Sequence, residues 1–304
     1  MAEVISIDPQ AVAPIQALTR PQRGLWSDAW RRLRRGTNAR VGMGVILVFV
    51  IVAVSIEFVN PYNPRIDGDL VNRLKAPSAA HLFGTDDQGR DVMRRVLHGA
   101  PISLQVGLLS VALALALGSS IGLTAGYMGG WFDTIAMRAM DIMLSFPSIL
   151  LAIAIVAARG PGLGNTMLAI GIVNIPVYAR IARAVTLSVK EQEYITAARA
   201  IGVRSVRMIS RHILPNSLSP LIVQGTLSIA TAIIEAAGLG FLGLGAQPPT
   251  PEWGAMLSDG YKYLTIGAWW VLLFPGLAIM LTVLGFNLFG DGLRDALDPR
   301  LRSD

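Results

Sequence analysis

Cysteine is absent from this sequence, which excludes disulfide frameworks, cysteine-ligated metal sites and thiol catalysis. Charge is scarce: 15% of the 304 residues are Asp, Glu, Lys or Arg, whereas soluble globular chains carry about 25%. Hydrophobic residues, in contrast, make up 53%. Because one aqueous shell cannot cover so much apolar surface, we expect lipid to be the main solvent of the chain.

The usual catalytic motifs are also missing. There is no GxxxxGK[ST] phosphate loop, no HExxH and no GxSxG elbow, so we expect neither nucleotide hydrolysis nor hydrolase chemistry. The three histidines, His81, His98 and His212, lie far apart in sequence, which argues against a shared metal site. The sequence therefore predicts a non-catalytic chain with no metal or cofactor of its own.

Six apolar stretches are each long enough to cross about 30 Å of hydrocarbon as a helix. They are residues 41–59, 104–127, 135–157, 167–185, 220–238 and 266–288. The net charge of +6 also occurs in nucleic-acid-binding proteins, but positive charge on the cytoplasmic side of a membrane protein explains it better. We therefore predict an all-α polytopic membrane protein with six transmembrane helices.

The distribution of arginine predicts the orientation. Seven arginines precede the first span, so the positive-inside rule places the N-terminus in the cytoplasm, and six spans return the C-terminus there. We predict a cytoplasmic tail over residues 1–40, a transmembrane domain over 41–290 and a cytoplasmic tail over 291–304. Trp26 and Trp30 fit either a short helix at the membrane interface or a plain tail.

The basic loop between the fourth and fifth spans, residues 186–216, has helical periodicity. Ile195, Ala198 and Ile201 fall near one face, and Gly202 interrupts the pattern. An apolar stripe then resumes at Val206, Ile209 and Ile213. We predict a helix, a glycine turn and a second helix, which form a compact knob on the cytoplasmic side. This knob either docks a partner or only connects two spans.

The loop resembles the conserved cytoplasmic loop of ABC-importer permeases, which reads EAA, three residues, Gly, nine residues, Ile, one residue, Leu-Pro. The corresponding residues are Thr196-Ala197-Ala198, Gly202, His212 and Leu214-Pro215. Thr196 and His212 depart from the acidic residue and the isoleucine of the pattern, and Glu193 offers an acidic group one turn earlier. Residues 81–104, 125–148, 240–257 and 286–301 are similar to the dipeptide and oligopeptide permease family, closest to its C-type subunit. The resemblance covers residues 41–302.

This resemblance implies the type I ABC-importer permease fold and a role as one permease subunit of an ATP-driven peptide importer in the cell membrane. The implied partners are a second homologous permease, two ATPase chains that bind ATP and Mg²⁺, and an extracytoplasmic peptide-binding protein. The loop would contact the ATPase through Glu193, Tyr194, Ala197, Ala198, Arg199, Gly202 and Val203. Import of glutathione, nickel or haem by the same architecture is the alternative, and an ion-driven secondary transporter is a further one.

Two carboxylates, Asp141 and Glu235, fall inside predicted spans, where a charge is costly and usually faces a bundle interior or a wet cavity. They either line the translocation pathway, where they would meet a peptide amine, or fix helix packing. Arg138 lies one turn before Asp141 and is its candidate partner.

Two predicted outer segments carry the remaining candidates. GTDDQGRD, residues 84–91, lacks the register and the terminal Glu of a calcium loop, so we expect an N-cap for a helix starting near Asp87 or a docking surface for the binding protein. QPPTPEWGAML, residues 247–257, would form a gate, a docking surface or a re-entrant packing element. The candidates for an outer gate or docking are Asp86, Asp87, Arg90, Pro249 and Trp253. We expect Trp269 and Trp270 in an interfacial belt.

Overall fold

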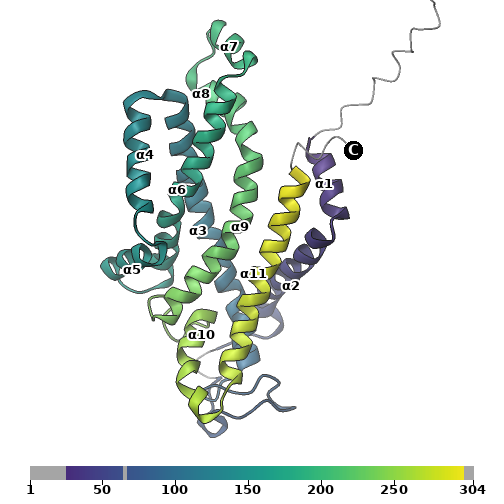
Figure 1. Ribbon diagram of the computed structural model, residues 1–304. Coiled ribbons are helices and arrows are strands. Elements are labelled where there is room, and N and C mark those ends of the chain that lie inside the picture. Colours follow the sequence, from purple (N-terminus) through teal and green to yellow (C-terminus); the bar gives the residue numbers. More distant parts are fainter. Residues whose placement is uncertain (1–24, 64–66, 298–304) are drawn as a thin grey trace, which may run out of the picture.

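The computed structural model describes residues 25–63 and 67–297, and helices form its framework throughout (Figure 1). Five helical stretches are long and apolar enough to cross a membrane. Four are α2 (Thr37–Val59), α3 (Val92–Met128), α6 (Leu163–Lys190) and α11 (Trp270–Leu297), and the fifth continues through α9 (Leu214–Phe241). A bent pair of helices supplies a sixth candidate span. The prediction of an all-α polytopic membrane protein is confirmed.

The third predicted span, residues 135–157, is wrong as a continuous helix. α4 (Gly130–Leu144) and α5 (Ser148–Arg159) are separated by a short break, and their axes differ by 93°. Pro147 lies in the break with an extended ψ of 130°. A proline lacks a backbone N–H and disfavours the helical conformation of the residue before it, here Phe146, so the helix ends at this point.

The closest helix pair is α3 with α6, and glycine makes this contact possible. A Cβ atom at Gly118 would lie 2.5 Å from the Ile175 carbonyl oxygen, and one at Gly122 would lie 2.1 Å from the Ala179 carbonyl oxygen. Small residues at four-residue spacing allow two helix backbones to approach closely in a membrane, where packing rather than hydrophobic burial drives association. The α3–α6 pair therefore forms the centre of the bundle.

The two ends of the bundle differ. At one end lie α1 (Leu25–Arg35), α7 (Glu193–Ala200), α8 (Ser205–Met208) and the end of α11, as Figure 1 shows. At the other end lie α10 (Trp253–Gly260), the 3₁₀ turns Leu70–Asn72 and Tyr261–Ile266, and the loop over residues 73–91. We call residues 67–91 together with α10 and Tyr261–Ile266 the outer cap. The arginine-rich N-terminal helix and the basic loop thus share one end of the molecule.

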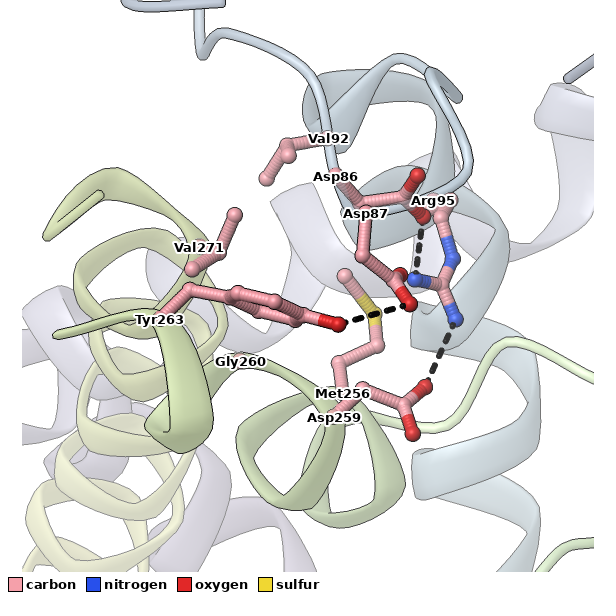
Figure 2. A pocket seen from close by; sticks show the side chains of 9 residues that line it. All are labelled: Asp86, Asp87, Val92, Arg95, Met256, Asp259, Gly260, Tyr263 and Val271. Atoms are coloured by element: carbon pink, nitrogen blue, oxygen red, sulfur yellow. Dashed lines mark hydrogen bonds and ion pairs between the residues drawn. The ribbon is translucent and has the colours of Figure 1, made fainter. Parts of the chain in front are cut away.

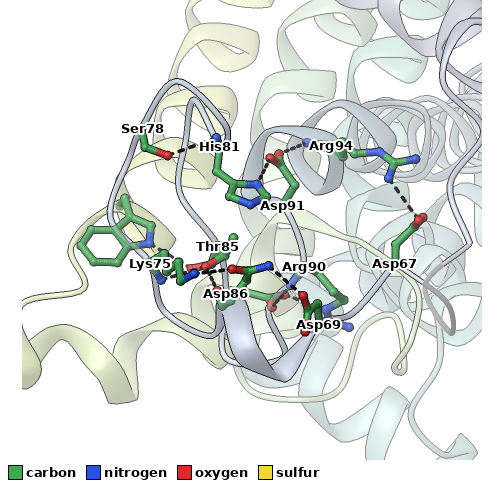
Figure 3. A network of polar contacts seen from close by, with 12 residues as sticks. Asp67, Asp69, Lys75, Ser78, His81, Thr85, Asp86, Arg90, Asp91 and Arg94 are labelled. Carbon is green, nitrogen blue, oxygen red and sulfur yellow. Dashed lines mark hydrogen bonds and ion pairs between the residues drawn. The ribbon is translucent and has the colours of Figure 1, made fainter.

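A buried ion cluster holds the outer cap together; Figure 3 shows its Asp86 and Arg90, and Figure 2 shows Asp86 with Arg95. The Asp86 carboxylate accepts hydrogen bonds from Arg90 Nε at 2.7 Å and from Arg95 Nη1 at 2.6 Å, and all three residues are buried. The prediction that residues 84–91 supply an N-cap is confirmed, because Asp91 accepts the backbone N–H of Arg94 at 3.0 Å, but α3 begins at Val92 rather than near Asp87. The buried charges of this segment therefore compensate one another.

Two tryptophans fasten the outer cap to the bundle. Trp253 Nε1 donates to the Val96 carbonyl at 2.9 Å, and Trp270 Nε1 donates to the Thr85 carbonyl at 3.0 Å. Trp270 is 7% exposed, so its predicted place in an interfacial belt is wrong, whereas Trp269 is 49% exposed. A buried Trp needs an acceptor for its N–H, and both acceptors are backbone carbonyls of the segment around the start of α3.

Because the ion cluster is buried, we predict that loss of its one carboxylate strongly lowers the stability of the folded protein. In the variant Asp86→Asn, the buried guanidinium groups of Arg90 and Arg95 lose their closest counter-charge. We expect the free energy of unfolding to fall by about 3–5 kcal/mol, because an uncompensated buried charge remains. Denaturant unfolding of the detergent-solubilised protein measures this change.

The matched control is Asp67→Asn, which removes the partner of Arg94 at 3.1 Å; these side chains are 22% and 28% exposed. An ion pair near the surface contributes about 0–1 kcal/mol, so we expect a much smaller effect. Equal losses for the two variants would contradict a stabilising role of the buried cluster.

Candidate functional site

The loop between α6 and α9 folds as a helix, a glycine turn and a second helix, which confirms the predicted shape of the knob. The turn after α7 places Gly202 at φ 79°. Its N–H donates to the Arg199 carbonyl at 3.0 Å, and the Val203 N–H donates to the Ala198 carbonyl at 3.1 Å. These two bonds are the Schellman arrangement that ends a helix, and glycine is favoured there because its φ is positive.

The knob has an inner face, which packs on the bundle. Ile195 and Met208 are fully buried, and Ala198 is 9% exposed. Val203 is partly buried against the same hydrophobic cluster. Of the residues expected to contact an ATPase, Ala198 and Val203 therefore face the bundle. Glu193, Tyr194, Ala197, Arg199 and Gly202 are exposed.

The outer face of the knob is apolar at its tip. Ile201 is 83% exposed and Val206 is 79% exposed, so Ile201 does not share the buried face of Ile195 and Ala198, and Val206 does not share that of Ile213. Ile201 lies beyond the last residue of α7 and no longer follows its periodicity. Between Val206 and Ile213, the π-helical turn Ile209–Ile213 changes the helical register, which turns Val206 away from the bundle. Arg199, Arg204, Arg207 and Arg211 surround this tip and are exposed.

Tyr194 connects α7 to the start of α9. Its ring centroid lies 6.4 Å from that of His212, and the Asn216 side-chain amide donates to its hydroxyl at 3.3 Å. His212 is one of the two positions at which the loop departs from the permease pattern. The aromatic contact braces the knob against the helix that crosses the membrane, and sequence reasoning missed it because it joins residues 18 positions apart.

The two carboxylates of α4 are paired with arginines of α6. Asp141 accepts a hydrogen bond from Arg180 Nη2 at 2.6 Å, so the predicted pairing with Arg138 is wrong. Asp133 accepts two bonds from Arg183, at 2.6 and 2.7 Å. The chain bends so that α4 lies beside α6. Asp141 therefore pairs with Arg180 of α6 and not with Arg138 one turn away in α4.

Glu235 of α9 differs from Asp133 and Asp141 in the kind of partner that it has. It is partly buried and accepts a hydrogen bond from the Asn174 side-chain amide at 3.2 Å. Among residues 25–63 and 67–297, no Lys, Arg or His forms an ion pair with it. It is thus a spanning carboxylate with a neutral partner.

In the outer cap, the five candidates separate into buried and accessible residues. Asp86, Arg90 and Trp253 are at most 4% exposed and serve the internal contacts described above. Pro249 is exposed and Asp87 is partly exposed. Figure 2 shows Asp87 beside the Tyr263 hydroxyl, which donates to it at 3.4 Å. Of the five candidates, Asp87 and Pro249 are therefore the two with accessible surface.

The same region holds a small cavity of about 10 Å³, lined by Asp87, Arg95 and Asp259 among others (Figure 2). Arg95 Nη2 lies 3.6 Å from Asp259 Oδ2. Burial raises the pKa of Asp259, and the nearby Arg95 acts against this increase. The cavity is the size of one water molecule, so it is a packing feature of the outer cap and not a cargo site.

A larger open cavity lies among α6, α9 and α11 on the side of the knob. Its volume is about 530 Å³. Ile181, Asn216, Ser219, Pro220, Val223, Gln224, Leu227, Arg294 and Leu297 line it. Sequence reasoning missed this cavity, since its residues come from three helices that are far apart in the chain.

Two family models match the chain. Residues 118–303 match the binding-protein-dependent transport system inner membrane component family. Residues 24–77 match the N-terminal TM domain of oligopeptide transport permease C. The two matches together extend over most of the chain.

Relatives agree with this assignment. The chain is 52% identical over 278 residues to the dipeptide transport system permease protein DppC of Alkalihalophilus pseudofirmus, which covers 91% of each chain. It is 46% identical over 295 residues to the glutathione transport system permease protein GsiD of Escherichia coli, which covers 96% of this chain and 97% of the relative.

A solved structure agrees in fold. An inward-facing form of the MetNI methionine ABC transporter aligns with a TM-score of 0.55 and 20% identity, over 68% of this chain and 98% of that one. At this identity the likeness concerns the fold alone. The chain belongs to the binding-protein-dependent transport system inner membrane components, the multi-pass permease subunits of ABC importers.

Proposed function

We propose that this permease subunit forms half of the translocation pathway of an ATP-driven importer of dipeptides or oligopeptides. The observation that carries the proposal is the 52% identity to a dipeptide permease over 91% of both chains. Glutathione is the alternative cargo, supported by the 46% identity to a glutathione permease. Both cargoes are peptides with a free amino group, so the two proposals differ in side chains rather than in chemical class.

We further propose that the subunit itself is non-catalytic and works with four partner chains. These are a second homologous permease, two ATPase chains, and an extracytoplasmic peptide-binding protein that supplies the cargo. ATP and Mg²⁺ would bind to the ATPase chains. ATP-driven closure of the ATPases would move the knobs of both permeases, which exposes the pathway alternately to the two sides of the membrane.

The knob is the proposed ATPase contact. Its tip combines the exposed side chains of Ile201, Val206 and Tyr194 with a rim of arginines. An apolar centre with a polar rim, and with Tyr and Arg among its residues, is typical of protein interfaces. Glu193, Ala197, Arg199 and Gly202 lie on the same exposed face. Ala198 and Val203 would act indirectly, because they attach the knob to the bundle.

This assignment predicts that Ile201→Asp impairs ATPase binding without unfolding the permease. Ile201 makes little contact within the chain, so we expect unchanged thermal stability, but a charge in an apolar interface should weaken it by about 2 kcal/mol or more. Co-purification of the ATPase chains and peptide uptake by reconstituted complexes measure the loss.

The control is Leu70→Asp, which changes another exposed aliphatic residue, 74% exposed, at the opposite end of the molecule. It should retain the ATPase chains. Full co-purification and uptake by Ile201→Asp would contradict the proposed contact. Uptake by the two permeases without any ATPase would instead support the ion-driven alternative.

The proposed orientation places the knob in the cytoplasm and the outer cap outside. It rests on the arginines of α1 and of the knob, which share one end of the bundle, and on the positive-inside rule. Both termini would then be cytoplasmic, in the cell membrane. Asp87 and Pro249, accessible in the outer cap, are the proposed contacts for the binding protein.

Because the chain has no cysteine, single cysteines report this topology directly. Ala79→Cys in the outer cap and Thr196→Cys in the knob are both at exposed positions. We expect a membrane-impermeant maleimide to label Ala79→Cys in intact cells and Thr196→Cys only after permeabilisation. The reverse pattern would overturn the orientation.

For Asp141 and Glu235 the sequence leaves two alternatives, a place in the translocation pathway or a role in helix packing. The pair that Asp141 makes with Arg180 supports its alternative role in helix packing. Glu235 has no such partner among the described residues, and we retain it as the proposed pathway residue.

A further inference from the structure

The spanning carboxylates differ in how their charge is compensated. Asp133 and Asp141 each meet an arginine at 2.6 Å, whereas within residues 25–63 and 67–297 Glu235 receives only neutral donors. These are the Asn174 amide at 3.2 Å and the hydroxyl of Ser148. A carboxylate inside the membrane without a cation is costly, and such residues usually face a bundle interior or a water-filled cavity and mark substrate or ion pathways.

The site lies deep within the span. Asn174 is 11 residues from the start of α6, which corresponds to roughly 16 Å along the helix axis. With a hydrocarbon thickness of about 30 Å, the Asn174–Glu235 contact falls in the interior of the bilayer. Snorkelling to the surface therefore does not relieve the cost of the charge.

A polar stripe leads from the cavity near the knob to Glu235. Along α9, Gln224, Ser228, Thr231 and Glu235 follow at spacings of four, three and four residues, which places them on one helix face. Gln224 lines the cavity of about 530 Å³, and its amide donates to the Ser228 hydroxyl at 3.1 Å. Along this face Thr231 is exposed, Gln224 and Glu235 are partly buried and Ser228 is 7% exposed. Lipid-facing helix surfaces are apolar, so this polar face of α9 does not belong to the lipid boundary.

The break between α4 and α5 adds non-helical backbone next to this stripe. Ser145, Phe146, Pro147 and Ser148 are all exposed in the chain. Irregular backbone at membrane depth is tolerated only where protein buries it or water lines it. Because the Ser148 hydroxyl interacts with the Glu235 carboxylate, the break and the carboxylate belong to the same polar region.

We propose that Glu235, held by Asn174 and Ser148, is a subsite for the ammonium group of the peptide during its passage through the membrane. This subsite rests on the proposed function, and it specifies which chemical group of the cargo the pathway recognises. An α-amino group has a pKa of about 7.7–8.0, so it is mostly charged at pH 7 and complements the carboxylate. A metal ion fits less well, because no group of three or more His, Asp or Glu side chains in the described part of the chain is placed to hold one.

The test uses the complete importer in proteoliposomes, with radiolabelled glycyl-leucine and glutathione as probes. In Glu235→Gln the hydrogen bond from Asn174 retains an acceptor, but the charge is lost. We expect ATP-driven uptake of both probes to fall by about tenfold, because a charge-assisted contact is lost along the path. Glu235→Asp keeps the charge and should retain uptake within about twofold.

A second measurement distinguishes a role of Glu235 in cargo binding from a role in helix packing. ATPase stimulation by the cargo-loaded binding protein should persist in Glu235→Gln, since the knob is unchanged. The control Glu57→Gln makes the same chemical change in α2, where the Glu57 side chain is 71% exposed, and should leave uptake unaltered.

Unchanged uptake by Glu235→Gln overturns the subsite. A parallel loss of complex assembly or of stimulated ATPase activity also overturns it, because Glu235 would then be a packing residue. Failure of the wild-type complex to import either probe overturns the peptide function itself, and with it the cargo of this subsite.

Discussion

A charge inside a lipid bilayer must find a partner, and this requirement determines how the helices of the protein are joined. In the outer cap, Asp86 compensates two buried arginines and thereby fixes a loop to the start of α3. Within the bundle, Arg180 and Arg183 attach α4 to α6 through two carboxylates. Desolvation makes each isolated charge expensive, so these pairs restrict which helices can be neighbours. Glu235 is informative because it departs from the same rule.

Much of the fold was predictable from composition and apolar runs. The lipid environment and the long spans follow from the scarcity of charge and from the apolar runs. The shape of the knob follows from helical periodicity. The break at Pro147 was not predicted, although the proline is visible in the sequence. Pro176, Pro220 and Pro275 lie inside continuous helices. Whether a proline ends a helix depends on whether neighbouring helices satisfy the freed backbone groups, and this is a property of the packed bundle.

The site was predictable in outline and not in its contacts. Gly202 was identified correctly because the turn requires a positive φ. The partner of Asp141 was not, because Arg180 reaches it only through the turn of the chain between α4 and α6. The outward orientation of Val206 depends on a π-helical turn, which sequence periodicity does not reveal. Long-range pairing and irregular helical register are thus the two features that a single sequence leaves undetermined.

The helical stretch that runs from Ser205 to Phe241 links the two proposed sites mechanically. It begins in the knob, is braced there by Tyr194 through Asn216, and carries Glu235 near its far end. A helical stretch of 37 residues is roughly 55 Å long and can act as one lever, with the π-helical turn Ile209–Ile213 near its knob end. A tilt of this lever at the proposed ATPase contact would displace the proposed cargo subsite. Energy supplied on one side of the membrane can therefore reposition a group inside it without a relay of intervening side chains.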